Sequence, residues 1–530
     1  MQSLFIVKRV HRIGDVRTPR HVVVVGAGVG ALAAAIDLAW AGCEVTVVER
    51  ADEPGGKLAS VDVGGSLIDA GPTVLTMRWV FEELFASVDR TLEAYFTTEP
   101  VDILARHAWP DGARLDLHAD PERSAQAVRD TFGAREAGAF RAFCARTKVI
   151  YDTVEAPFLR SQRPGLAGVL RQAGSFGPTV LFRIDALRTM GKALEATFAE
   201  PRLRQLFGRY ATYTGSSPFE APATLSLIAH VERLGVHRVA GGMRALGGAL
   251  ANLARELGVR FQFGSHVNEI IVTGGRARGV RLEGEGRLAA DAILFNGDTA
   301  ALAGGLLGRE AASAVKPSPP GLASLSAITW AIAGRAEGFR LDHHNVFFSA
   351  DYPREFQALL REGRCADEPT VYACAQGSVH EGRAGQSDGG EERLLLVVNA
   401  PPTGADAAAW SDEEIHRWQQ ATFSTLNRCG LTLTPRATRV TTPADYHRRF
   451  PGTGGSLYGP RARGALSSLS RPGSRSKTEG LYLAGGSTHP GPGVPMAALS
   501  GRLAARQILT DLGSTPRSPR GDTSGTTSTR

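Results

Sequence analysis

The chain has 530 residues, of which 43% are hydrophobic and 21% charged, with 62 glycines and 29 prolines. This balance is typical of soluble globular proteins and excludes a wholly disordered chain, a collagen or a coiled coil. The net charge of +7 is concentrated in the two ends of the chain, which leaves the body close to neutral. Because a nucleic-acid binder needs a basic face on its folded body, we expect no nucleic-acid partner.

The cysteine pattern and the apolar runs indicate the cellular compartment of the protein. The five cysteines form no CxxC pair, so neither a zinc ribbon nor a disulfide framework is expected, and we predict no metal centre. The basic N-terminal residues are not followed by the apolar core of a secretory signal. No apolar run that lacks glycine and charge reaches the ~18 residues of a membrane span. We therefore expect a cytoplasmic protein.

A strand, a glycine turn and a helix open the chain. His21–Val25 reads as a buried strand, Gly26-Ala-Gly28-Val-Gly-Ala31 as a tight turn, and Ala31–Ala41 as a helix. Gly26 permits the turn, Gly28 lets backbone N–H groups approach a pyrophosphate, and Ala31 allows close packing of the helix on the strand. This pattern predicts a Rossmann-like α/β fold that binds an adenine dinucleotide, the alternative being a glycine turn in an unrelated βαβ unit.

An acidic residue and a second glycine segment follow. Glu49 ends the predicted strand Glu44–Glu49, where its carboxylate can accept both hydroxyls of a ribose. Gly55-Gly56-Lys57 and Asp69-Ala-Gly71-Pro72-Thr73 then allow the chain to touch the pyrophosphate a second time. That arrangement suits a cofactor bound extended and permanently, which favours FAD over NAD. A solvated Pro-Gly-Gly turn is the alternative.

The middle of the chain is less regular. Residues 76–224 have mainly helical spacing, interrupted by the apolar stretch Pro157–Val180, which is either core or a membrane-dipping surface. Near Gly241 the pattern returns to strands, with a hairpin over Val267–Leu282 and a strand over Ala289–Asn296. Residues 320–440 alternate strands with one helix, Asp412–Cys429.

The C-terminal run contains the third glycine segment. The strand Leu481–Ala484 delivers Gly485-Gly486, and Val494-Pro495-Met496 starts a helix whose free N–H groups can stabilise negative charge on a flavin. A surface loop that caps an ordinary helix is the alternative. We predict a discontinuous FAD-binding domain (21–75, 225–310 and 441–512), an inserted α+β substrate domain (76–224 and 311–440), a basic extension (1–20) and a flexible tail (513–530).

Several of these segments together resemble a known family. Phe207–Tyr213, Ala221–Leu225, Phe450–Pro460 and above all the run GGSTHPGPGVPMAALSG make the chain similar to the phytoene-desaturase-like carotenoid oxidoreductases. These are FAD enzymes with the amine-oxidase type of fold. Within the family it looks most like the bacterial 1-hydroxycarotenoid 3,4-desaturases. Two departures are Ala31, where glycine is commoner, and His237, where an aromatic residue is commoner.

The resemblance implies a cofactor site and an activity. The family's FAD contacts fall on Gly26, Gly28, Glu49, Gly56, Lys57, Gly71, Val267, Gly486 and Met496, with Ala31 completing the glycine fingerprint; for Val267 a plain core valine is the alternative. The implied reaction introduces the C3–C4 double bond into an acyclic 1-hydroxycarotenoid. The partners are then a membrane surface, since carotenoids dissolve only in lipid, and oxygen or a quinone as electron acceptor. The protein is accordingly expected to attach peripherally to the membrane.

Other candidates remain open. The rival functions are a phytoene or neurosporene desaturase, a carotene isomerase, a flavin amine oxidase, and a non-enzymatic isoprenoid-binding protein of the same fold. No catalytic residue is assigned, and His489 is more readily structural than catalytic. His343 and His344 are expected to point to opposite faces of an extended segment and so to bind no metal. Tyr210, Thr212 and Tyr213 are candidate hosts for a substrate hydroxyl.

Overall fold

The structure, a computed structural model, describes residues 20–162, 180–284, 286–377, 391–465, 467 and 470–513. The predictions on the basic extension and the C-terminal tail, and on most of the apolar stretch 157–180, therefore lie outside the described residues. Within the described part of the chain, none of the helices combines the length and the apolar character that crossing a bilayer requires.

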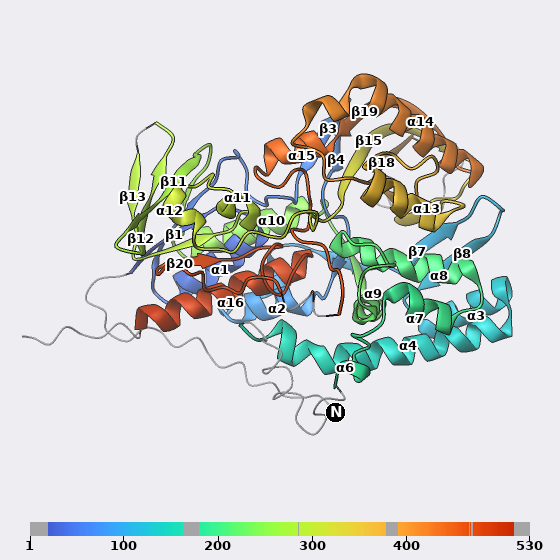
Figure 1. Cartoon of the computed structure of the whole chain (residues 1–530), viewed down its shortest axis with the longest axis horizontal. Coiled ribbons are helices and arrows are strands. Elements are labelled where there is room, and N and C mark those ends of the chain that lie inside the picture. Colours follow the sequence, from blue (N-terminus) through green and yellow to red (C-terminus); the bar gives the residue numbers. More distant parts are fainter. Residues whose placement is uncertain are drawn as a thin grey trace, which may run out of the picture.

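A parallel sheet forms one half of the molecule, on the left in Figure 1. Its five strands run in the order β10-β2-β1-β14-β20. They are β1 (His21–Val25), β2 (Glu44–Val48), β10 (Arg260–Gln262), β14 (Ala292–Phe295) and β20 (Leu481–Leu483). The central strands β1 and β14 read as nearly unbroken apolar runs because both faces of the sheet are covered. The predicted α/β fold class is confirmed.

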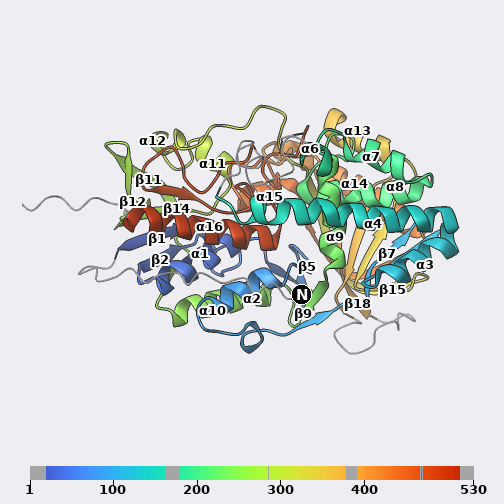
Figure 2. The ribbon, with the colours of Figure 1, turned by 90° about the horizontal axis from the view of Figure 1, so that it is seen from below.

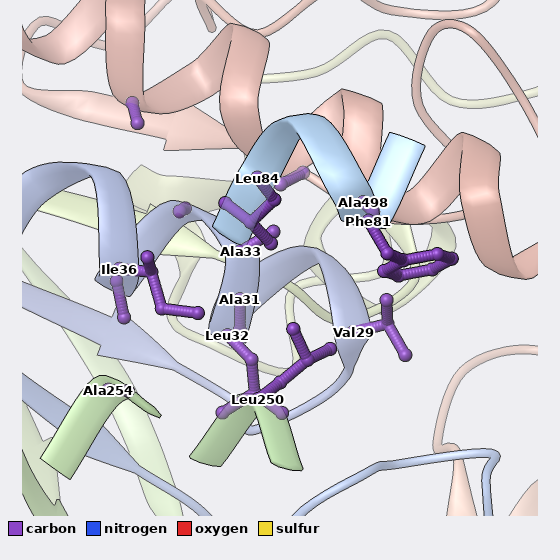
Figure 3. Packing of buried hydrophobic residues seen from close by; sticks show 14 of the residues in the cluster. Val29, Ala31, Leu32, Ala33, Ile36, Phe81, Leu84, Leu250, Ala254 and Ala498 are labelled. Atoms are coloured by element: carbon purple, nitrogen blue, oxygen red, sulfur yellow. The ribbon is translucent and has the colours of Figure 1, made fainter. Parts of the chain in front are cut away.

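Helices cover one face of this sheet. They are α1 (Val29–Trp40), α2 (Trp79–Ala86), α10 (Arg244–Glu256) and α16 (Val494–Gly513). Val22 and Val24 of β1 point into this helical layer. Figure 3 shows α1 enclosed by the other three helices, with Leu32 towards Leu250 of α10 and Ala33 towards Leu84 of α2.

A smaller antiparallel sheet covers the opposite face. It consists of β11 (Val267–Thr273), β12 (Arg276–Leu282) and β13 (Arg287–Ala289), and Val23 and Val25 pack against it. The predicted hairpin is present. The strand expected over Ala289–Asn296 is present as β14 but begins three residues later, because the chain turns at Ala290–Asp291 and Ala289 belongs to β13 of the other sheet.

A second, mostly antiparallel sheet lies in the other half of the molecule (Figure 1). Its seven strands run in the order β19-β15-β18-β17-β16-β7-β8. They are β7 (Ile103–Ala108), β8 (Arg114–His118), β15 (Ser326–Glu337), β16 (His344–Phe347), β17 (Val371–Ala375), β18 (Glu391–Ala400) and β19 (Thr432–Thr441). The helices α13 (Tyr352–Gln357) and α14 (Asp412–Arg428) pack on it.

Helices from residues 121–233 pack beside this sheet. They are α3 (Pro121–Phe132), α4 (Ala134–Val154), α6 (Val180–Arg183), α7 (Met190–Thr197), α8 (Pro201–Gly208) and α9 (Leu227–Arg233). Figure 2 shows the long helix α4 running along the underside with α9 beside it. The mainly helical prediction for 76–224 missed β7 and β8, because the alternation of Leu115 and Leu117 spans only five residues.

The hairpin of β3 (Ser60–Val63) and β4 (Ser66–Asp69) joins the two halves. Although it belongs to the first predicted segment of the FAD-binding domain, it packs on the second sheet, with Ile68 in one cluster with Ala331 and Leu395. The division into two domains stays a prediction. The division is supported by the two large sheets, because each takes its strands from the segments predicted for one domain. The hairpin β3–β4, however, crosses the proposed boundary.

Helices α1 and α16 contact each other at two glycines, and this contact can be tested. A Cβ on Gly501 would lie 1.9 Å from the carbonyl oxygen of Gly30. We expect Gly501→Ala to lower the free energy of unfolding by about 1–3 kcal/mol, because the helices must separate. Gly248→Ala in α10 is the matched control. A Cβ there meets no atom within 4 Å, so it should be neutral or raise stability by about 0.5–1 kcal/mol. Thermal unfolding of both variants decides, and equal behaviour would contradict the close contact.

Candidate functional site

A cavity of about 1110 Å³ lies between the glycine segments and the second sheet. Its wall contains nine of the ten residues predicted to bind the cofactor: Gly26, Gly28, Glu49, Gly56, Lys57, Gly71, Val267, Gly486 and Met496. Ala31 does not reach the wall. It is fully buried in α1, in keeping with its predicted role in packing the helix on the strand.

The glycine segments meet backbone to backbone. The N–H of Gly55 donates to the carbonyl oxygen of Ala27 at 2.8 Å. A Cβ on Gly56 would lie 3.1 Å from Cα of Gly28, and one on Gly71 only 1.9 Å from the carbonyl oxygen of Lys57. Gly56 also has φ of +62°, which favours glycine. The three loops can therefore approach only as glycines, and their backbone faces the cavity.

The N-terminus of α1 opens on this cavity. Its N-cap is Gly28, which offers no side-chain cap, and its first turn holds no acidic residue. The first N–H groups of a helix have no partner within it and carry partial positive charge. This end of α1 therefore suits an anionic group such as a pyrophosphate.

Glu49 is held rigidly at the end of β2. Its Oε2 accepts a hydrogen bond from the N–H of Ala27 at 2.6 Å, and its Oε1 accepts from the N–H of Ala51 at 2.8 Å. The side chain is only 8% exposed. Each oxygen keeps a lone pair after these bonds, so the carboxylate can still accept from two hydroxyls of a ribose.

Two cations lie on the same wall. Lys57 Nζ donates to the carbonyl oxygen of Leu457 at 2.5 Å, and Arg471 donates to the carbonyl oxygens of Tyr458, Gly486 and Pro460. Burial lowers the pKa of Lys57, and that of Arg471 to about 10, with the carboxylate of Asp298 opposing both shifts. Within the described residues neither cation forms an ion pair.

These observations test whether the site fits FAD. A buried charge without a counter-ion is costly, so two such cations facing a cavity indicate an anionic ligand there. The uncapped helix, the Glu49 carboxylate with its free lone pairs and the side-chain-free glycine backbone match the parts of a dinucleotide. The residues therefore fit FAD. Sequence reasoning missed Arg471, because nothing in the sequence around it indicates that its segment returns to Gly486.

The opposite part of the cavity wall is mainly apolar. It is built from α9, the second sheet and the short helix Glu155–Leu159, and its apolar residues include Phe158, Leu159, Leu225, Leu227, Ile228, Val231, Leu395 and Val397. Of the described residues in the apolar stretch 157–180, residues 157–159 thus face the cavity. An elongated apolar ligand would be desolvated along this wall.

A buried charged cluster interrupts the apolar wall. Arg209 donates to the hydroxyl of Tyr213 at 3.0 Å, and Tyr213 donates to Glu232 at 2.7 Å. Burial acts to lower the pKa of Arg209, but Tyr213 and Glu232 outweigh it and raise that pKa. Of the three proposed hydroxyl hosts, Thr212 and Tyr213 line the cavity. The prediction that Tyr210 binds a substrate hydroxyl is wrong. This residue is 2% exposed, lies behind the wall, and donates to Glu232.

Three histidines can now be placed. His489 Nε2 lies 2.8 Å from the carbonyl oxygen of Phe158, and this bond supports the structural role favoured from the sequence. The rings of His343 and His344 are 4.5 Å apart, so the expectation that they point to opposite faces is wrong. His343 lies just before β16, where the alternation of a strand does not yet hold. Burial raises the pKa of the neighbouring Cys374 to about 12, and the absence of a metal stays a prediction.

Known proteins are similar to this chain over nearly its whole length. The family model of flavin-containing amine oxidoreductases matches residues 32–509. A hydroxyneurosporene desaturase of Rubrivivax gelatinosus is 46% identical, over 97% of this chain and 98% of the relative. One of Cereibacter sphaeroides is 44% identical, over 94% and 99%. The structure of a putrescine oxidase superposes with a TM-score of 0.59 at 15% identity, over 93% and 99%, which shows the shared fold.

Glu49 provides a direct test of the cofactor site. Glu49→Ala should weaken FAD binding by about 1.5–3 kcal/mol, because charge-assisted hydrogen bonds to the ribose are lost. Glu53→Ala, an exposed glutamate in the same loop, is the matched control and should bind FAD like the wild type. Titration calorimetry of FAD into the flavin-free protein measures both. Full FAD affinity in Glu49→Ala would show that this carboxylate does not bind the cofactor.

Proposed function

Because the chain belongs to the flavin-containing amine oxidoreductase family, we propose that it acts as a carotenoid desaturase. The chain is an FAD-dependent oxidoreductase. The proposed reaction introduces the C3–C4 double bond into an acyclic 1-hydroxycarotenoid such as 1-hydroxyneurosporene. One observation carries this proposal: the glycine segments and the long apolar wall line one continuous cavity.

The chemistry explains why the wall is apolar. Desaturation removes a hydride and a proton from adjacent carbons, and bound FAD supplies the hydride acceptor that no side chain can provide. Loss of the hydride at C4 leaves a positive charge delocalised over the polyene, which makes the C3 proton acidic, so a weak base suffices. The chain's task is then to align the polyene and to exclude water.

The rival functions differ in the ligand that the cavity must hold. A phytoene or neurosporene desaturase, or a carotene isomerase, would need the same apolar wall and differs only in the end of the substrate. A flavin amine oxidase is disfavoured by the C-terminal run and by the names of the relatives at 44–46% identity. A non-enzymatic isoprenoid carrier would not need Glu49 and the cations Lys57 and Arg471 around the glycine segments. Oxygen or a quinone as final electron acceptor stays a prediction.

Peripheral attachment to a membrane is part of the proposal. Helix α6 exposes Phe182 (71%), and Leu187 nearby is 57% exposed. Leu181, which precedes Phe182, and Ile184, which lies between the two exposed residues in the sequence, line the cavity. Arg146 donates to the carbonyl oxygen of Phe182 and places a cation beside this surface. An apolar surface next to the cavity and flanked by cations suits the entry of a carotenoid from an anionic bilayer.

The substrate can be tested with two carotenoids. Purified protein with FAD should convert 1-hydroxyneurosporene in liposomes to a product whose absorption is shifted to the red by the longer polyene. Phytoene lacks the hydroxyl and should be converted poorly, because the group that binds the hydroxyl would be left unpaired. Absorption spectra of the extracted pigments decide. Turnover of phytoene without turnover of the hydroxylated carotenoid would favour the first rival.

Membrane attachment is tested by flotation with anionic liposomes. Phe182→Ser should reduce the floating fraction, because the apolar contact is lost. Leu67→Ser replaces a residue of 46% exposure on the hairpin β3–β4, on the opposite side of the molecule from α6 in Figure 1, and should leave it unchanged. High salt should weaken the electrostatic part of the attachment. Wild-type protein that never floats would refute the proposed attachment.

A further inference from the structure

Three hydrogen-bonded side chains lead from the cavity into the second sheet. The hydroxyl oxygens of Thr73 and Tyr372 lie 2.7 Å apart, and Tyr372 Oη lies 2.7 Å from His344 Nδ1. Thr73 and Tyr372 line the cavity, whereas His344 is 2% exposed. Thr73 follows Gly71 by two residues, so this hydroxyl pair lies where the cofactor-side loops meet the second sheet.

The hydrogen-bonded side chains Thr73, Tyr372 and His344 carry their protons in a way that leaves them able to bind another hydroxyl. Burial holds the pKa of His344 well below its usual value and that of Tyr372 well above it, so both side chains are neutral. In either tautomer of His344, the two internal hydrogen bonds leave at least one oxygen lone pair unused on the pair Thr73–Tyr372. A donor arriving through the cavity therefore finds an acceptor that is already oriented.

The proposed reaction limits where a C1 hydroxyl can lie. Three C–C bonds and one C–O bond of about 1.5 Å separate the hydroxyl oxygen from C4, so the two lie no more than about 5 Å apart. The carbon that loses the hydride must face the cofactor. The group that binds the hydroxyl must therefore lie close to the cofactor, and a group at the far end of the polyene cannot serve.

The hydroxyl pair meets this condition. A tertiary hydroxyl that enters the apolar cavity loses its water and needs a hydrogen-bond partner there. In the cluster of Arg209, Tyr213 and Glu232, the hydroxyl of Tyr213 accepts from Arg209 and donates to Glu232, so it can offer a substrate only its one remaining lone pair.

We propose that the hydroxyl pair Thr73–Tyr372, positioned by His344, binds the C1 hydroxyl of the substrate and makes the enzyme select hydroxylated polyenes. This inference rests on the proposed carotenoid desaturase function. It names the residues that distinguish 1-hydroxyneurosporene from neurosporene, which lacks the hydroxyl. It also gives the pair Thr73–Tyr372 a role in aligning C4, because binding of the hydroxyl fixes the end of the polyene.

Two variants test the selection. Tyr372→Phe and Thr73→Val each remove one hydroxyl at nearly constant volume. Each should lower the ratio of kcat/KM for 1-hydroxyneurosporene to that for neurosporene by about tenfold, the effect of losing one hydrogen bond in an apolar site. The dissociation constants of both carotenoids provide a second readout. They are measured by tryptophan fluorescence quenching on protein whose FAD has been reduced, so that no turnover occurs, and the affinity ratio should fall similarly.

A second threonine–tyrosine pair on the same wall provides the control. Thr329 and Tyr446 line the cavity, with their hydroxyl oxygens 3.4 Å apart. Tyr446→Phe should leave the selectivity ratio unchanged. Flavin absorption of each variant shows that it is folded and loaded with FAD.

The outcomes separate this inference from the function on which it rests. If the wild type prefers the hydroxylated carotenoid but both Tyr372→Phe and Thr73→Val keep that preference, the hydroxyl pair is not the selecting group and the desaturase function stands. An equal loss of preference in Tyr446→Phe would also overturn the inference. If the wild type converts neither carotenoid, the proposed function itself fails.

Discussion

At the N-terminus of α1, three segments far apart in the sequence approach one another so closely that no Cβ fits between them. Gly56 lies against Gly28, and Gly501 lies against Gly30. A side chain at Gly501 would separate α16 from α1, and one at Gly56 would displace the second loop. The rest of the site depends on this contact, because it turns bare backbone N–H groups towards one cavity.

The remaining wall of the cavity is supplied by a second sheet with different chemistry. The parallel sheet is covered by helices on one face and by β11–β13 on the other, so it can offer a ligand only its carboxyl edge. The second sheet presents side chains such as Leu395 and Val397 to the cavity. The part of the cavity at the glycine segments therefore offers polar backbone and cations, which match a dinucleotide. The part at the second sheet offers aliphatic side chains, which match a polyene.

The buried polar groups on this wall differ in whether their charges find partners within the protein. Glu232 receives hydrogen bonds from two tyrosines and lies in the field of Arg209, so its charge is balanced within the cluster, although Nε of Arg209 finds no hydrogen-bond partner among the described residues. Within the described residues, Lys57 and Arg471 donate hydrogen bonds to carbonyl oxygens and form no ion pair, and Lys57 also lies over the ring of Phe450. Their charge remains to be balanced by a ligand, and this difference assigns the cations to the cofactor.

The sequence by itself determined the α/β fold, the cofactor and nine positions on the cavity wall. The glycine spacing and Glu49 are local patterns with a steric and hydrogen-bonding purpose, whereas positions such as Val267 and Met496 followed from the family resemblance. It missed β7 and β8, whose alternation is too short to stand out among helices, and placed Tyr210 on a wall that this residue does not reach. Only the tertiary structure brought Arg471 to Gly486 and Tyr372 to Thr73, residues 299 positions apart. Such contacts depend on how two sheets pack across a cavity, and no local pattern of residue types encodes that packing.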